Sequence, residues 1–513
     1  MKRVWQKGVL LLTVGLLVQA ASGMGLGRPA TRTIRVAEAT DAVTLDPAFA
    51  ADRPSHTVIG HIFQRLVRYE YDAGSGRLNV VPELAQRIES SADARNWTVV
   101  LRAGQSFSDG SPVDAIAVKY SLERLLAPAI GSPYRPLLEP IERIEVLGPE
   151  RLRIVTRVPY SSLVENLAAY QTAVVSRLAA GRVALREFGR QPVGSGPYQL
   201  SEWAVGRQVV LTRNERYAGR QPWADALVFR PIPEGSTRVV ALEAGDVDVA
   251  MRVPPEAAAR LEGREDVRLL RVPTTFQISF ELNHRRKPFD DPRVRRALNL
   301  AVDRRAIVER VLLGAGFVPR GPAPRGVTYR AELREFPYDP EAARQLLTEA
   351  GYPQGFSTVL WVPSARYLKD VEVAQAVQAY LAAVGVRAEI RVWEWGAYVS
   401  AIARPDKEAG MYLLGISIPT ADWRFFRNLH SEAPTNYSGY RNRDVDRLLE
   451  QARSATGERE KRDLYERVQR IVWEDCPYLF LYDQVLLVGV RRGLEGVRIL
   501  PIETIDLSGA RGR

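Results

Sequence analysis

Hydrophobic residues follow two periods along the chain, a period of two that predicts strands and a period near 3.6 that predicts amphipathic helices. The first period predicts short strands at 33–38, 97–102, 144–147, 152–155, 208–213, 227–230, 267–272, 277–282, 386–392 and 478–490. The second predicts helices at 292–301, 340–350 and 370–384 and around Leu464–Val472. Strands and helices that alternate in this way are typical of an α/β fold.

Three helix starts are predicted by a capping residue followed by proline, at Ser111-Pro112, Asp291-Pro292 and Asp339-Pro340. The first side chain can cap the helix, and proline suits the first turn because no backbone donor is needed there. After Ser111, helical spacing places Val113, Ile116, Ala117 and Tyr120 on one face. The charged run Glu458–Asp463 is interpreted as a solvated segment before the last helix.

The composition is that of an ordinary globular protein with two to four domains. The 513 residues include 46% hydrophobic and 26% charged residues, enough to bury a large core. No run of 18 apolar residues occurs, which excludes a polytopic membrane protein. Because Cys476 is the only cysteine and the four histidines are scattered, we expect no disulfide, no metal site and no cofactor.

The net charge is +11, of which Lys2, Arg3 and Lys7 supply three, leaving +8 on the rest of the chain. The densest basic run extends from His284 to Arg296 and is interrupted by Asp290 and Asp291. We interpret this run as a solvated loop and helix face, and nucleic acid is not an expected partner.

The N-terminus has the pattern of a secretory signal peptide at residues 1–22. Basic residues precede an apolar run of ten residues, Val9–Val18, and small residues follow at Ala20–Ser22. Ten residues are too few to span a bilayer, although an uncleaved anchor is the alternative. No cysteine for lipid attachment lies near the cleavage site. We therefore expect a mature protein that is soluble in the periplasm and monomeric.

The sequence offers little support for catalysis. The phosphate-binding G-x-x-x-x-G-K-[ST] motif is absent. Gly194-Ser195-Gly196-Pro197 lacks the G-x-S-x-G spacing of a nucleophile elbow, so a tight turn is the simpler interpretation. The alternative is a secreted hydrolase, which would pair a serine with His56 or His61. A binding protein is favoured over it because the chain is expected to be exported, to form large α/β lobes and to have no evident reaction centre.

Several segments, in the same order along the chain, resemble signatures of the family 5 extracellular solute-binding proteins, the dipeptide-, oligopeptide- and nickel-type receptors of ABC importers. The resemblance covers about residues 33–505. It rests on Thr44–Pro47, Ile62–Tyr69, Val81–Ala85, Trp97–Pro112, Val193–Tyr198, Leu282–Asn299 and Tyr338–Pro353. Most of these are turns and helix caps, which preserve a scaffold without naming a solute.

The resemblance implies a two-lobed fold of the type II periplasmic-binding-protein kind, with an extra domain in the first lobe and the ligand cleft between the lobes. The first lobe is expected at 33–60, 165–268 and 485–510, the extra domain at 61–164 and the second lobe at 269–484. Crossing strands are expected near Leu269–Arg271 and Leu481–Val485, where closure would bend the chain.

The resemblance also implies candidate ligand-binding residues. In dipeptide and oligopeptide receptors, an aspartate holds the ligand's amino terminus, but in this chain Pro419 occupies that position. Asp422 is then either a replacement amine ligand or a helix cap. Arg366 is either a carboxylate ligand or a surface arginine, and Trp393 and Trp395 are expected to point to opposite faces of a strand end. The full set is Asp52, Arg53, Arg366, Tyr367, Trp393, Trp395, Ser417, Asp422 and Trp423.

The expected function is therefore capture of a small solute or peptide and its delivery to an ABC permease. A solute-sensing protein or a chaperone on the same scaffold is the alternative. The solute itself stays open between a peptide, an opine, a glutathione-like compound, a sugar and a metal complex, and for the last of these His284 and His430 are weak candidates. The missing aspartate predicts weak binding of ordinary dipeptides with a free amine.

Overall fold

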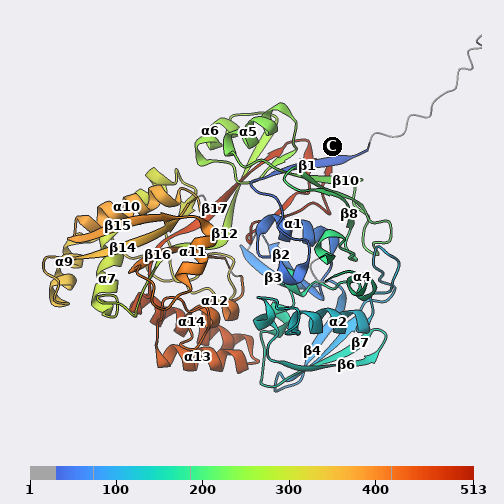
Figure 1. Ribbon diagram of the computed structural model, residues 1–513, viewed down its shortest axis with the longest axis horizontal. Coiled ribbons are helices and arrows are strands. Elements are labelled where there is room, and N and C mark those ends of the chain that lie inside the picture. The colour runs from blue at the N-terminus through green and yellow to red at the C-terminus, as the bar shows by residue number, and fades with distance from the viewer. Residues whose placement is uncertain are drawn as a thin grey trace, which may run out of the picture.

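The computed structural model describes residues 31–72, 74, 76–184, 187–364, 366–417 and 419–512, so the signal peptide expected at 1–22 lies outside the described residues. The fold is mixed α/β, and Figure 1 shows helices and strands gathered on the left and the right around strands that run between them. Among the described residues, no helix is long and apolar enough to cross a membrane. The names first lobe, extra domain and second lobe refer to the residue ranges expected from the sequence, and these ranges remain a proposal.

A large sheet extends through both lobes with the strand order β15-β14-β16-β12-β17-β11-β1-β10-β9-β8 (Figure 1). The second-lobe strands are β14 (Phe356–Pro363), β15 (Val386–Trp393) and β16 (Met411–Ser417). The first-lobe strands are β1 (Thr33–Glu38), β8 (Tyr198–Ala204), β9 (Gln208–Arg213), β10 (Ala226–Pro231) and β11 (Val249–Ala250). The sheet therefore continues from one lobe into the other.

The two crossing strands are β12 (Val267–Leu282) and β17 (Tyr478–Arg491), which pair antiparallel along most of their length. The strands predicted at 267–272 and 277–282 are thus parts of one long strand. Their register shifts between Pro273 and Gln277, so that Thr274–Phe276 lie opposite Gln484 alone. Such an irregularity bends a strand, and here it places Phe276 where the two lobes meet.

Helices of the second lobe cover its half of the sheet and extend below it in Figure 1. They are α7 (Pro292–Ala301), α8 (Arg304–Ala306), α9 (Pro340–Glu349), α10 (Asp370–Ala382), α11 (Trp395–Ile402), α12 (Ala421–Leu429), α13 (Arg443–Ser454) and α14 (Glu458–Asp475). Asp291 and Asp339 cap α7 and α9 as predicted, each accepting a hydrogen bond from a backbone amide of the first turn.

Helices of the first lobe and extra domain are shorter on average. They are α1 (Arg53–Ile62), α2 (Ala115–Leu126), α3 (Leu163–Asn166), α4 (Arg177–Arg182), α5 (Gly235–Ala244) and α6 (Ala258–Glu262). The extra domain contains a sheet of order β4-β5-β7-β6, at the lower right of Figure 1, and the hairpin β2–β3. Their bounds are β2 (Val67–Asp72), β3 (Arg77–Pro82), β4 (Ala85–Ser90), β5 (Asn96–Leu101), β6 (Ile141–Gly148) and β7 (Arg151–Thr156).

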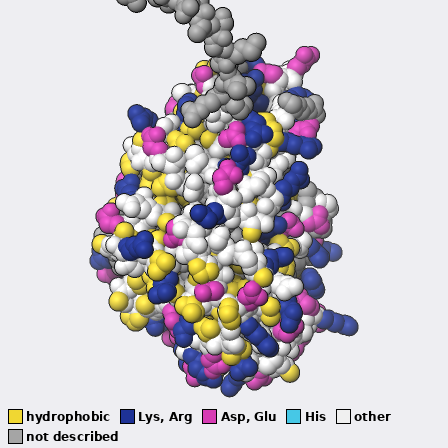
Figure 2. Space-filling view, turned by 90° about the vertical axis from the view of Figure 1, so that its right-hand side faces the viewer, with side chains coloured by type: hydrophobic (Ala, Val, Ile, Leu, Met, Phe, Trp, Pro, Cys, Tyr) yellow, Lys and Arg dark blue, Asp and Glu magenta, His cyan; other side chains and the backbone are white. Residues whose placement is uncertain are grey.

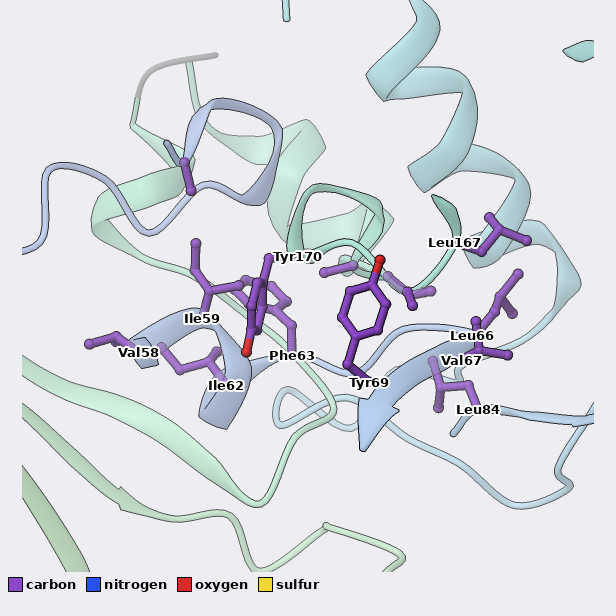
Figure 3. Packing of buried hydrophobic residues seen from close by; sticks show 14 of the residues in the cluster. Val58, Ile59, Ile62, Phe63, Leu66, Val67, Tyr69, Leu84, Leu167 and Tyr170 are labelled. Carbon is purple, nitrogen blue, oxygen red and sulfur yellow. The ribbon is translucent and has the colours of Figure 1, made fainter. Parts of the chain in front are cut away.

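The first core is one cluster of buried side chains that joins the first lobe to the extra domain. Figure 3 shows part of it, where Ile62 and Phe63 at the end of α1 pack near Tyr170, and Leu66 and Val67 pack near Leu167. The same cluster contains residues near both ends of the chain, because β17 and the segments after it return to the first lobe. Those segments include β18 (Leu494–Glu495), β19 (Arg498–Leu500), β20 (Thr504–Asp506) and β21 (Arg511–Gly512). The short strand β13 (Gly316–Phe317), earlier in the chain, pairs with β17 in the large sheet.

Two predicted helix starts were wrong. Helix α2 begins at Ala115 with Asp114 as its cap, because Asp114 accepts a hydrogen bond from the Ala117 amide while the Ser111 hydroxyl donates to Asp109 in the preceding turn. Ile116, predicted on the buried face, is 51% exposed. Helix α14 begins at Glu458, so the charged run Glu458–Asp463 forms its first turns. Acidic residues there suit the positive end of a helix.

The surface carries charges of both signs. Figure 2 shows one face of the molecule, on which Lys and Arg side chains are interspersed with Asp and Glu. Over the described residues, many charged side chains form solvent-accessible ion pairs, such as Arg264 with Asp266 and Arg293 with Asp291. Pairs of this kind contribute little to stability.

Candidate functional site

Two arginines from opposite lobes approach the same aromatic ring. The guanidinium carbon of Arg53, in the first lobe, lies 5.3 Å from the centroid of the Phe276 ring, and that of Arg366, in the second lobe, lies 5.9 Å from it. Both side chains are partly buried. Among the described residues, neither guanidinium forms an ion pair with a carboxylate. We call Arg53, Phe276, Arg366, Trp395 and Ser417 the interlobe site.

Arg53 sits at the first position of α1, held there by the helix cap before it. Asp52 accepts hydrogen bonds from the Ser55 amide (2.8 Å) and hydroxyl (2.7 Å). Asp52 thus fixes the start of α1, and its carboxylate is already engaged within its own lobe. Arg53 reaches across to the second lobe, where its Nη2 donates to the Ser417 carbonyl at 3.4 Å.

The electrostatic surroundings of Arg53 favour an added anion. Burial lowers the pKa of the Arg53 guanidinium, Glu503 partly offsets that effect, and Arg366 and Arg252 lower the pKa further. Glu503 is itself bound to Arg252 at 2.6 Å. An anionic ligand between Arg53 and Arg366 would relieve the repulsion between them.

Arg366 is positioned by the loop that leads into α10. The backbone amides of Arg366 and Tyr367 both donate to Asp370 Oδ2, at 2.9 and 3.1 Å. The guanidinium lies 4.8 Å from the Trp395 ring centroid and 5.1 Å from that of Tyr367. Aromatic faces attract a cation without neutralising it, so the guanidinium keeps its hydrogen-bond donors for a ligand. Tyr367 is buried in the second-lobe core, and among the described residues its hydroxyl has no hydrogen-bond partner.

The prediction that Trp393 and Trp395 point to opposite faces of one strand was wrong. Residues two apart on a strand share a face, so alternation could not have separated the two rings, and in any case β15 ends at Trp393 and Trp395 begins α11 after the cap Glu394. Both rings pack against one cluster, in which Trp393 lies 4.7 Å from Trp361 between ring centroids. Of the two, Trp395 is the one in contact with Arg366.

Ser417 supplies the second-lobe contact of Arg53, and Pro419 follows it two residues later. The Ser417 hydroxyl is 2.9 Å from the Thr275 hydroxyl, which ties the end of β16 to the crossing strand. The Pro419 carbonyl accepts hydrogen bonds from both the amide (3.0 Å) and the hydroxyl (3.1 Å) of Thr328. Pro419, at the position where the resemblance to dipeptide receptors leads one to expect an amine-binding aspartate, thus offers no carboxylate, and its carbonyl already accepts two hydrogen bonds.

Asp422 neither caps α12 nor stands free in the interlobe site. Its carboxylate is 1% exposed and pairs with Arg453, at 2.7 Å from Oδ1 to Nε and 3.4 Å from Oδ2 to Nη2. The cap position of α12 belongs to Thr420, so the capping interpretation was wrong. The pairing also leaves Asp422 without a free carboxylate oxygen facing a ligand amine in this structure.

Arg453 connects the second lobe to the extra domain. Its guanidinium carbon lies 3.6 Å from the Phe426 ring centroid and 5.5 Å from that of Tyr160 in the extra domain. Its carbonyl accepts a hydrogen bond from the Ser161 amide at 3.1 Å. Trp423 also crosses the boundary, because it packs against the first core. The structure therefore holds the lobes together on both sides of α12.

Sequence reasoning missed three residues of this region. Phe276 lay between the two strands predicted at 267–272 and 277–282, Tyr134 belongs to the extra domain, and Arg427 follows Trp423 by one helical turn. The i, i+4 spacing of Trp423 and Arg427 could have indicated a stacked pair. In the structure, their guanidinium-to-ring distance is 4.3 Å.

The residues of the hydrolase alternative are used for packing. Ser195 is 2% exposed in a turn whose flanking glycines touch the backbone of Ile62. His56 Nε2 contacts the Ala50 carbonyl, and His61 Nε2 accepts a hydrogen bond from the Leu507 amide. Burial lowers the pKa of His56 to about 3, so this imidazole is neutral and a poor proton acceptor near neutral pH.

Metal-ligand geometry is absent from the described part of the chain, where no group of three or more His, Cys, Asp or Glu side chains could hold an ion. His284 Nε2 lies 3.3 Å from the Pro477 carbonyl, and His430 Nε2 lies 3.3 Å from Glu450. The two weak candidates for a metal-complex ligand thus have separate protein partners.

A cavity of about 1390 Å³ lies on the hinge side of the same boundary. Its lining comes from β2 and β3, from Leu270–Pro273, from the loop Arg325–Arg330, from the start of α14 and from Val497–Pro501. Several of its charges are paired within the protein, among them Arg68 with Glu70 and Arg498 with Asp506. The hydrogen bond from the Thr275 amide to the Pro501 carbonyl (2.8 Å) lies between this cavity and the interlobe site.

Two lobes joined by paired crossing strands, with arginines from both lobes over one ring and no carboxylate partner for either among the described residues, are the architecture of a two-lobed binding protein. Comparison with known proteins identifies the family. The model of the bacterial extracellular solute-binding proteins, family 5 Middle, matches residues 79–436. The chain belongs to this family, whose members supply ABC importers with solutes, as was expected from the sequence motifs.

Curated relatives share about a third of the residues. The glutathione-binding protein GsiB of Escherichia coli (strain K12) is 32% identical, with 98% of this chain and 97% of the relative covered. GsiB of Shigella dysenteriae serotype 1 is 34% identical, with 92% and 93% covered.

Solved structures share the fold along nearly the whole chain. The periplasmic binding protein DppA from Helicobacter pylori, in complex with peptide STSA, has a TM-score of 0.80 at 26% identity, with 93% of this chain and 98% of that chain covered. AgaA, in complex with agropinic acid, has a TM-score of 0.79 at 25% identity, with 94% and 99% covered.

Proposed function

We propose that this solute-binding protein captures a peptide-like compound through a carboxylate held between Arg53 and Arg366, and delivers it to an ABC permease. The observation that supports this most strongly is the approach of two guanidinium groups, one from each lobe, to the Phe276 ring, with no carboxylate partner for either in the part of the chain that the structure describes. Glutathione is the first candidate solute, because the curated relatives are named for it and it carries carboxylates.

A carboxylate at this position would couple binding to closure. An arginine presents paired donors that match the two oxygens of a carboxylate. Because Arg53 and Arg366 belong to different lobes, a carboxylate that contacts both binds the closed form more tightly than the open one. The ligand carboxylate would thus supply the negative charge between Arg53 and Arg366.

An ammonium anchor of the family type is not part of this proposal. Pro419 replaces the aspartate, and Asp422 is bound to Arg453. A buried ammonium without a carboxylate partner typically loses about 3–5 kcal/mol. Weak binding of ordinary free-amine dipeptides is therefore still expected, whereas a ligand dominated by carboxylates suits the site.

The remaining parts of the proposal come from the sequence. We propose that residues 1–22 are a signal peptide, that the mature protein is a soluble periplasmic monomer, and that it has no enzymatic activity of its own. N-terminal sequencing of the periplasmic fraction tests the first point, with a start near Ala21 as the expected result. Recovery of the intact N-terminus in the membrane fraction would contradict it.

Titration calorimetry of the purified protein tests the solute. Glutathione should bind, and Arg366→Gln should weaken binding by about 30- to 4000-fold, because one buried charge-pair partner is typically worth 2–5 kcal/mol. Arg404→Gln is the matched control, since Arg404 is 70% exposed and pairs with exposed Asp406. Tight binding of solutes without a carboxylate, unchanged in Arg366→Gln, would refute the proposal.

A further inference from the structure

The extra domain contacts the second lobe at a place that the interlobe site does not use. The Ser161 amide donates to the Arg453 carbonyl at 3.1 Å, and the Ser161 hydroxyl donates to the same carbonyl at 3.2 Å. In the other direction, Lys461 Nζ donates to the Ser161 carbonyl at 3.4 Å. Ser161 and Lys461 are both buried, so these hydrogen bonds are made away from water. We call Ser161, Arg453 and Lys461 the clasp.

The second-lobe side of the clasp is the end of one helix and the start of the next. Helix α13 ends at Ser454, so the Arg453 carbonyl lies in its last turn, where the helix has no further amide to donate to it. Lys461 lies in the first turn of α14. Ser161 therefore completes the end of a helix in one lobe with donors that come from the other side of the boundary.

The extra domain holds Ser161 in a fixed place. The amide of the preceding residue, Tyr160, donates to the Ala94 carbonyl at 3.0 Å, and the Tyr160 hydroxyl donates to the Leu137 carbonyl at 3.2 Å. The Tyr160 ring is itself part of the first core. Ser161 must then move with the extra domain, so its contacts with α13 and α14 can exist only while the lobes are together.

The clasp and the crossing strands join the lobes at separate places. Leu270–Pro273 of β12 line the large cavity at the lobe boundary, and Ser161 and Lys461 line the same cavity. In Figure 1, β12 and β17 lie higher in the view than α13 and α14, which lie beside the extra domain. Opening about the crossing strands would draw α13 and α14 away from Ser161, and closure would bring them back.

We propose that the clasp is a latch for the closed form, which sets how long a solute stays bound without touching that solute. This inference goes beyond the proposed function, because the latch would act on any solute that the interlobe site accepts. The clasp hydrogen bonds form only once the lobes meet. Their loss should therefore speed release and leave the association rate unchanged, whereas loss of a solute contact would change the preference among solutes.

Distances between two spin labels on the mature full chain test the latch. Glu89→Cys in the extra domain and Arg404→Cys in the second lobe place the labels at exposed positions, whereas Cys476 is buried. The protein is measured alone and with excess glutathione, and the wild type should show a closed form in at least one sample. Ser161→Ala should lower the ratio of closed to open form about two- to tenfold, and Lys461→Met, which removes a charged donor, about ten- to hundredfold.

Stopped-flow release of glutathione is the second measurement. Release should become faster by the same factors in Ser161→Ala and Lys461→Met, at an unchanged association rate. Ser454→Ala is the matched control, because the Ser454 hydroxyl donates to the Glu450 carbonyl (3.2 Å) within α13 and is exposed. Amide exchange in β5 and β14, inside the extra domain and the second lobe, should be unchanged in each variant, which separates a latch from a general loss of structure.

A wild type that is open in both samples would overturn the inference, because the clasp would then not form in solution. Variants that keep the wild-type closed fraction would overturn it too, and glutathione binding that depends on Arg366 would still support the proposed function. Failure of glutathione to bind would count against glutathione as the solute, and the sample without solute would still decide on the latch.

Discussion

Replacing Arg453 by methionine should destabilise α12 far more than its exposure suggests. The Asp422 carboxylate is 1% exposed, and Arg453, which is 26% exposed, is its ion-pair partner at 2.7 Å. Burial acts to lower the pKa of Arg453, but the Asp422 carboxylate and, after it, Tyr160 and Tyr465 act in the opposite direction, so that the pKa is raised. Removing the arginine leaves a buried carboxylate unpaired, which typically costs about 3–5 kcal/mol.

Amide hydrogen exchange is the appropriate assay because a chain of several domains does not unfold in one step. The expected loss corresponds to exchange of the α12 amides that is about a hundred- to several-thousand-fold faster. The double variant Asp422→Asn, Arg453→Met buries no charge, so most of the loss should disappear, and the two changes should be non-additive by at least about 2 kcal/mol.

Arg447→Met on α13 is the matched control. Arg447 pairs with Asp444 at 2.8 Å, but these side chains are 59% and 68% exposed, so the pair should contribute less than about 1 kcal/mol. Equal effects of Arg453→Met and Arg447→Met would refute the reasoning. An Asp422→Asn variant that loses dipeptide binding while the exchange rates of the α12 amides stay unchanged would also refute it. In that case Asp422 would bind the ligand amine rather than stabilise α12.

Two further predictions concern stability. Gly194→Ala should destabilise the fold by at least about 2 kcal/mol, because the added Cβ would lie 2.1 Å from the Ile62 carbonyl oxygen. In Gly181→Ala on α4, the added Cβ meets nothing within 4 Å and should stabilise the helix by about 0.5–1 kcal/mol. Similar melting temperatures for the two variants would contradict this. Burial raises the pKa of Glu281 from 4.5 to about 7, so between these values the unfolded state releases the proton first and the free energy of unfolding falls by about 3 kcal/mol as pH rises. Glu281→Gln should remove that fall when the opening free energy of β12 is measured from pH 4.5 to 7 by amide hydrogen exchange corrected for intrinsic rates. An unchanged pH slope would show that Glu281 ionises normally in the folded protein.

The local elements could be predicted from the sequence because their signals are local. Strand alternation located β1, a short apolar and polar strand pattern located β9, a continuous apolar run located β17, and the Asp-Pro pairs located α7 and α9. Helix α2 was misplaced by three residues because Ser111 and Asp114 can both cap, and only the turn around Asp109 decides between them.

The candidate site could be predicted only in part, because its contacts join distant segments. Arg53 and Arg366 were both candidates, but their approach to Phe276 depends on how β12 crosses between the lobes. The pairing of Asp422 with Arg453 spans two helices, and no spacing rule connects residues in α12 with residues in α13. Long-range register, rather than local propensity, decided these positions.

The return of the chain to the first lobe has a consequence for biosynthesis. The first core contains Ile34 and Val36 from the first strand together with Val488 and Leu507 from the last segments, and the Leu507 amide donates to His61 across more than 400 residues of sequence. The cluster that includes Phe276 and Tyr482, in contrast, is drawn from one continuous stretch of chain. The half of the molecule that the ribosome makes first is therefore the half that is finished last, and its exposed apolar strands need protection until the final segment emerges.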